Sequence, residues 1–213
     1  FNTTFVHNTL AKIYLENLQY AEIIPVLERT QKNILLFKTK ETFNFWHLLD
    51  YPEHLQKNKH KTNPEKYKQR RANHFCYKTR FAYCYANMFD DADDTAVGYL
   101  ALYYSDSIAK AGKNNAYKIG PLFSKYRDVG NRKTNWYNKR NGFNYRTGAF
   151  LTAFGPDRKH SNFILWFFPY KDKQNIFYGQ NEVDCVVNAN VLRTLALLDE
   201  TNTEGFRESC EFV

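Results

Sequence analysis

The sequence lacks a hydrophobic run long enough to cross a membrane. A spanning helix needs about 18–20 mostly apolar residues, whereas the aromatic run Ile164–Tyr170 is far shorter and contains a proline. We therefore expect no transmembrane segment. The chain begins with Phe1 instead of methionine, so either a leader has been removed or the sequence is trimmed. The first reading gives a slight preference for an exported protein, secreted or periplasmic.

Recognised cysteine and nucleic-acid motifs are also missing. The cysteines are Cys76, Cys84, Cys185 and Cys210, and no two form a C-x-x-C pair, which argues against a zinc ribbon or a thioredoxin-type site. Their redox state stays open. The net charge of +8 is concentrated in Lys57–Arg71, but no helix-turn-helix, zinc-finger or RNP-type pattern accompanies it. We interpret this stretch as a solvated loop and do not predict a nucleic-acid partner.

The remaining composition is that of a globular chain of 213 residues, enough for one domain with a substantial core. Apolar residues recurring every three or four positions predict helices. The first two should form a helical hairpin, and long loops should separate several of the later ones. The expected fold is thus a single all-α domain over residues 1–213, with helices at 2–18, 21–37, 79–88, 95–107, 145–154, 183–198 and 203–212, an extended aromatic segment at 163–178, and polar or irregular connections at 51–73 and 109–144.

The densest chemical feature is the run Asp90-Asp91-Ala92-Asp93-Asp94-Thr95-Ala96, which leads into an apolar helix. One or two of these aspartates would suffice to cap the helix and complement its dipole. Crowded carboxylates also repel one another, so that one group retains its proton, or they hold a cation. The cluster therefore indicates a cap, a cation site or an acid, and the sequence leaves these open.

Residues 91–96 resemble the D-x-D-D-T-A motif of class II terpene cyclases, within the terpenoid cyclase/protein prenyltransferase superfamily. A second segment, residues 181–192 (NEVDCVVNANVL), is similar to one found in uncharacterised bacterial members. The resemblance is specific only at these two places. It implies an α/α toroid, complete or partial, in which both acidic segments begin helices of the inner wall.

The same resemblance implies that Asp93 is a general acid that protonates an alkene or epoxide, with Asp91 and Asp94 as neighbours that raise its pKa. A carbocation would then need an aromatic cavity, which residues such as Phe45, Phe81, Tyr99 and Phe150 would line. Two features depart from cyclases: the chain contains no Q-x-x-x-G-x-W repeat, and it is two to three times shorter.

Other functions remain open. A glycan hydrolase or lyase would pair an aspartate of the cluster with Glu182 or Asp184 as acid and base. Zinc at Asp184 and Cys185, as in prenyltransferases, is disfavoured because adjacent helical residues point about 100° apart. A non-catalytic domain would use the same carboxylates as helix caps, or with bound Ca²⁺ or Mg²⁺, although no dedicated cofactor is predicted. We expect a small molecule or glycan as partner, do not predict the oligomeric state, and assign the ligand-binding residues as Glu182, Asp184, Asn188, Arg80, Trp46 and Tyr85.

Overall fold

The computed structural model describes residues 2–50, 68–71, 89–109, 117–130, 136–140, 142, 145–155 and 182–213. Helices predominate there, as predicted, and strands are short. The helices are α1 (Asn2–Glu16), η1 (Ala21–Ile23), α2 (Ile24–Leu35), α4 (Ala92–Ile108), α5 (Gly120–Lys125), α6 (Trp136–Arg140), α8 (Cys185–Leu197) and α9 (Phe206–Phe212). The strands are β1 (Lys38–Thr39), β2 (Thr42–Phe43), β3 (His47–Asp50) and β4 (Lys68–Arg71).

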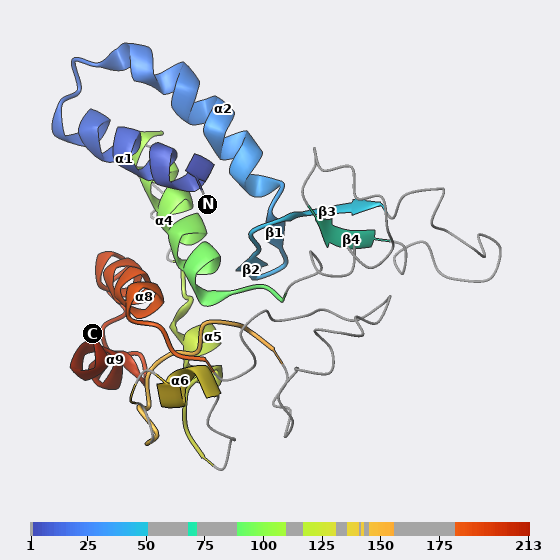
Figure 1. The fold of residues 1–213 in the computed structure, drawn as a ribbon. Coiled ribbons are helices and arrows are strands. Elements are labelled where there is room, and N and C mark those ends of the chain that lie inside the picture. Colours follow the sequence, from blue (N-terminus) through green and yellow to red (C-terminus); the bar gives the residue numbers. More distant parts are fainter. Residues whose placement is uncertain are drawn as a thin grey trace.

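Helix α4 is the centre of the molecule, with the α1–α2 hairpin packed on one side and α8 and α9 on the other (Figure 1). Its sequence is apolar around most of its circumference, which suits a helix buried by neighbours on several sides. Fully buried His7 of α1 joins three helices, because its ring nitrogens hydrogen-bond Thr30 of α2 and Ser105 of α4. The predicted N-terminal hairpin is therefore present and docked.

Helices α4 and α8 lie side by side and run in the same direction. Asn190 donates to Asp93 near the start of α4, and one turn further along α8 Thr194 donates to the carbonyl of Ala96. The expectation that these two helices pack together is confirmed. Because they are parallel, the two N-termini share one end of the pair and the two C-termini the other.

There are two short antiparallel strand pairs among the described residues, β1–β2 and β3–β4, and β2 contacts α4. The backbone N–H of Phe43 donates to the Thr95 hydroxyl, and the buried Phe43 ring occupies the space above Gly98. A Cβ on Gly98 would lie 2.7 Å from that ring, so the glycine permits the contact. The segment 51–73 was predicted to be a loop. Residues 68–71 form strand β4, so this prediction is wrong for them.

Residues 145–155 contain no helix, so the short helix predicted at 145–154 is wrong. The segment is extended because its backbone pairs with distant partners instead of with itself. Phe150 forms an isolated antiparallel β-bridge with Arg127, and Ala153 forms another with Asp91. Gly148, with φ +72°, makes the turn into this stretch, a conformation that glycine adopts without strain. The region 109–144 is also more ordered than predicted, since it contains α5 and α6.

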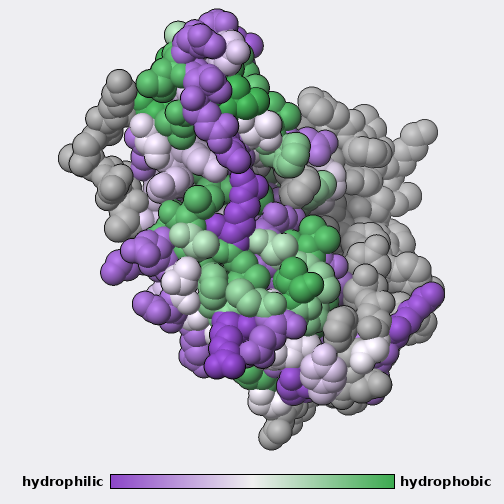
Figure 2. All heavy atoms as spheres, turned by 90° about the vertical axis from the view of Figure 1, so that its left-hand side faces the viewer, coloured by the Kyte–Doolittle hydropathy of each residue, from purple (hydrophilic) through white to green (hydrophobic). Residues whose placement is uncertain are grey.

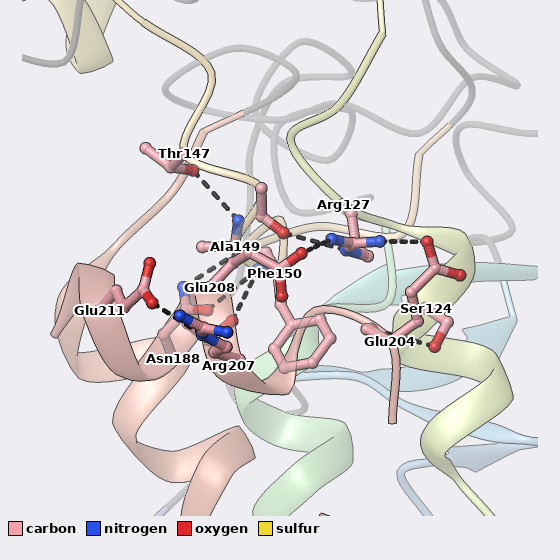
Figure 3. A network of polar contacts seen from close by, with 12 residues as sticks. Ser124, Arg127, Thr147, Ala149, Phe150, Asn188, Glu204, Arg207, Glu208 and Glu211 are labelled. Atoms are coloured by element: carbon pink, nitrogen blue, oxygen red, sulfur yellow. Dashed lines mark hydrogen bonds and ion pairs between the residues drawn. The ribbon is translucent and has the colours of Figure 1, made fainter. Parts of the chain in front are cut away.

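Buried Arg127 fastens the C-terminal helix to this extended segment (Figure 3). Its guanidinium donates to the Gly148 carbonyl at 3.0 Å and forms ion pairs with Glu204 and Glu208. Gly205 lies against the same side chain, where a Cβ would come within 2.6 Å of Nε. The arrangement satisfies all three guanidinium nitrogens and explains how a seven-residue helix stays docked.

The surface carries exposed hydrophobic residues on the outer helices. Figure 2 shows hydrophobic surface on either side of a hydrophilic strip that runs down from the top of the view, and more hydrophobic surface below it. Phe5, Leu36 and Val186 are among the well-exposed hydrophobic residues. Within the described residues, no helix is long and apolar enough to span a bilayer.

Candidate acid site at the start of α4 and α8

Three segments meet where α4 and α8 begin: residues 90–94, 150–154 and 182–184, hereafter the acidic junction. The Ala92 N–H donates to the Thr152 carbonyl at 2.8 Å, and the Thr152 N–H donates to the Glu182 carbonyl at 2.9 Å. The extended segment thus joins both helix starts through its backbone. This contact brings together the two acidic sequences that were expected to lie near each other.

Asp90 is the aspartate with a basic partner. Its carboxylate accepts hydrogen bonds from the Thr42 hydroxyl and from the Asn44 amide, and the buried Arg70 guanidinium lies 3.4 Å away. Arg70 also donates to the Trp46 carbonyl. From the sequence we assigned Arg80 as a ligand-binding residue. Arg80 lies outside the described residues. Arg70 is the basic partner of Asp90.

Asp91 and Asp94 lie together at the start of α4. Asp91 is the N-cap of α4, and its Oδ1 accepts from the Asp94 N–H at 2.7 Å. Burial, followed by the negative charge of Asp94, raises the pKa of Asp91 well above its usual range. Burial also raises the pKa of Asp94. Asp91 therefore caps α4, and burial favours the protonated form of both carboxyls.

Asp93 points toward α8 and not toward its own neighbours. Its Oδ1 accepts from the Asn190 amide at 2.7 Å. Burial raises the pKa of Asp93 to about 6, aided by the charges of Asp94 and Asp184 and opposed by the Asn190 hydrogen bond. A carboxyl with this pKa is present in both protonation states near neutral pH, which suits proton transfer.

Glu182 and Asp184 belong to the other side of the junction. Asp184 is the N-cap of α8 and accepts from the backbone of Val186 and Val187. The Glu182 side chain is 8% exposed and makes no hydrogen bond or ion pair with any described residue. Burial, with the nearby charge of Asp184, raises the pKa of Glu182 to about 7. Glu182 is therefore a protonatable carboxyl with no hydrogen-bond partner among the described residues, and it lies beside the N-cap carboxylate of Asp184.

The Thr152 hydroxyl is a polar group that sequence reasoning missed. It is buried and has no hydrogen-bond partner, although the Thr152 backbone bonds to both Ala92 and Glu182. The run RTGAFLTAF had suggested a helix, in which Thr152 would have had no link to either acidic segment. A threonine in an extended segment between two acids becomes a candidate only after the pairing is known.

The other predicted site residues are distributed as follows. Asn188 is fully buried and faces the core, where its amide donates to the Phe150 carbonyl and its oxygen accepts from the Phe150 N–H. Trp46 is half-buried against Phe45, near Arg70. Tyr85 and Phe81 lie outside the described residues. Of the expected aromatic walls, Tyr99 and Phe150 pack within the core.

No group of three or more histidine, cysteine or acidic side chains within the described ranges is arranged to hold a metal ion. Among the junction carboxyls, Asp91 and Asp184 accept from backbone N–H groups, and Asp90 and Asp93 accept from side-chain amides.

No protein-family model, curated protein or solved structure matches the chain.

Glu182 should make the stability of the protein depend on pH. Its pKa rises from an ordinary 4.5 to about 7 on folding, so the folded state binds the proton more tightly than the unfolded state. The resulting stabilisation is complete below about pH 4.5 and is lost as pH rises through about 7. Chemical denaturation at pH 5 and pH 8 measures it. Relative to Glu182→Gln, the wild type should lose roughly 2–3 kcal/mol over this interval, at about 1.4 kcal/mol per pKa unit.

The comparison with Glu182→Gln is needed because His7 acts in the opposite direction. Burial lowers the pKa of His7, so its contribution falls as pH drops through the ordinary histidine value of 6.5. That effect is common to both proteins and cancels in the difference. Parallel pH profiles for wild type and variant would contradict a buried, unpaired Glu182.

Proposed function

We propose that the chain is a ligand-processing domain of toroid-like architecture, in which Asp93 donates a proton to a neutral ligand at the acidic junction. Asp91 caps α4, Asp94 lies in the first turn of that helix, and Glu182 is the second protonatable group. The resemblance of residues 91–96 to the cyclase motif suggests an isoprenoid alkene or epoxide as the proton acceptor.

The observation that carries this proposal is the difference between Asp93 and the adjacent aspartates. Asp91 accepts from the backbone N–H of Asp94 in the first turn of α4. Asp93 is bound by one amide from another helix and has a pKa of about 6. Capping a helix requires only a side chain that accepts from the backbone, as Asp91 does. Asp93 contributes nothing to capping, so its partial burial favours a chemical role.

The unpaired Glu182 favours a second candidate, glycan hydrolysis or elimination. Such enzymes use two carboxyls, one protonated and one ionised, on opposite sides of the scissile bond. Asp93 and Glu182 come from different segments and have pKa values of about 6 and about 7, so near neutrality Asp93 would be the base and Glu182 the acid.

The two candidates differ in their substrates and in the residue that each needs protonated. Purified protein would be incubated with isoprenoid alkenes and epoxides, and separately with oligosaccharides, and products followed by mass spectrometry. Under the first proposal, Asp93→Asn should lower isoprenoid turnover by about 10²–10⁴-fold, the usual contribution of a general acid. Glu182→Gln should lower turnover more than Asp93→Asn only if the substrate that the protein cleaves is an oligosaccharide.

Asp93→Asn should fold normally, because the asparagine oxygen can still accept from Asn190 and the substitution removes repulsion from Asp94 and Asp184. Glu16→Gln, an exposed site at the end of α1, is the matched control for loss of one negative charge. If Asp93→Asn instead lowers the melting temperature and no substrate of either class is consumed by the wild type, Asp93 has a structural role and the proposal fails.

A further inference from the structure

A second potential site lies at the opposite end of the α4–α8 pair. A partly open cavity of about 750 Å³ is bounded by the C-terminal part of α4, by the start of α5, and by residues 197–204 between α8 and α9. Thirteen helical residues separate Asp93 from Asp106 in this wall, which corresponds to roughly 20 Å along α4. The cavity is therefore distinct from the acidic junction and has the size of many small-molecule sites.

The charge of the described lining is opposite to that of the whole protein. Asp106, Asp199, Glu200 and Glu204 line the cavity, against one basic residue, Lys118. The chain as a whole carries a net charge of +8. Glu204 is paired with Arg127, so the charge argument rests on Asp199 and Glu200 of the lining. A cation is therefore favoured over an anion in this cavity.

Glu200 is held rigidly at the wall. Its Oε2 accepts from the backbone N–H groups of Ile119 at 2.7 Å and Gly120 at 2.9 Å, whereas Oε1 makes no hydrogen bond. Thr203 also lies close to Gly120, where a Cβ would come within 2.2 Å of the Thr203 hydroxyl oxygen. A fixed carboxylate with one unused oxygen can accept from a ligand N–H without further ordering cost.

The remaining walls are suited to hydrocarbon. Tyr103, Leu197, Leu198 and Pro121 contribute apolar surface to the lining. Tyr117 donates to Asp106 at 2.6 Å, which orients that carboxylate. Aromatic rings beside carboxylates also favour cations through their quadrupoles. The lining thus combines separated negative groups with an apolar path between them.

From these contacts we infer that the cavity binds a small organic amine, with an ammonium group at the unused oxygen of Glu200 and a hydrocarbon portion along Tyr103 and Leu198. Asp199, exposed directly after α8, is within the same lining and supports a second ammonium group. Diamines with an aliphatic spacer fit this pattern best. The inference does not depend on chemistry at the acidic junction.

A matched pair of probes tests the inference: 1,8-diaminooctane and the neutral 1,8-octanediol, titrated calorimetrically into the full chain at about 150 mM salt, where long-range attraction is screened. The diamine should bind with a dissociation constant below about 1 mM, as expected for a ligand of ten heavy atoms. Glu200→Gln should weaken this binding at least about tenfold, the effect of losing a charged hydrogen bond.

Two further variants keep the test decisive. Asp199→Asn alters an exposed carboxylate and should weaken the diamine by a few-fold without affecting folding. Glu211→Gln removes one negative charge from α9, outside the cavity, and should leave the affinity unchanged. Equal binding of the diol, equal loss with Glu211→Gln, unchanged binding in both cavity variants, or no diamine binding near 1 mM would each overturn the inference.

Discussion

Replacing Asn188 with leucine should lower the free energy of unfolding by about 1–3 kcal/mol, because the buried Phe150 carbonyl would lose its partner, whereas the Phe150 N–H could still donate to Ser209. The Asn188 oxygen accepts from the Phe150 N–H, and its amide donates to the Phe150 carbonyl, both at 3.0 Å. The side chain is fully buried, so water cannot replace it. Leucine has a similar volume, and the measured loss should therefore report hydrogen bonding instead of a cavity.

The same substitution two residues later is the control. Asn190 is partly exposed on α8 and donates only to Asp93. Asn190→Leu should cost less than about 1 kcal/mol, although it should raise the pKa of Asp93 by removing the bond that opposes the effect of burial. Equal destabilisation by the two leucines in urea denaturation would show that the Phe150 backbone does not depend on Asn188.

Arg70→Met should destabilise the protein by roughly 3 kcal/mol, because it strands the largely buried Asp90 carboxylate. Arg70 is 2% exposed and lies 3.4 Å from Asp90, and it also donates to the Trp46 carbonyl. The methionine keeps most of the aliphatic volume while removing the charge. Thermal and urea unfolding would give the change in free energy.

A double substitution separates the charge effect from lost packing. In Arg70→Met/Asp90→Asn, the unpaired carboxylate is gone, and about half of the lost stability should return. Arg29→Met, at an exposed position of α2, should stay within about 0.5 kcal/mol of the wild type. If stability does not recover in the double variant, Arg70 stabilises the β3–β4 strand pair by packing alone.

Helices α4 and α8 were predictable because their signals are local. Each has an aspartate N-cap, Asp91 or Asp184, followed by a long apolar stretch. We expected α4 to begin at Thr95, but it begins at Ala92, because Asp91 caps it and Asp93 and Asp94 form its first turn. When several aspartates lie at a helix start, the sequence alone does not show which of them is the N-cap.

The extended segment at 145–155 was not predictable in the same way. Its residues have helical spacing, but the backbone of Phe150 bonds to Asn188, and Ala153 bridges Asp91. These partners lie far along the chain, and tertiary pairing outweighs local propensity there. For the same reason, sequence reasoning placed Asp93 and Glu182 at a site but did not identify Asn190, Thr152 or Arg70 around them.

The contacts between α4 and α8 also determine when the acidic junction can form. Asp93 and Asn190 are 97 residues apart in the chain, and the segment that joins the helix starts lies between them. During synthesis, the N-terminal hairpin and α4 are complete while α8 has still to be made. Closing so long a loop is slow compared with forming a local hairpin. The carboxyls at the start of α4 should therefore remain hydrated and ionised in early folding intermediates, and acquire their raised pKa values only in the last steps of folding.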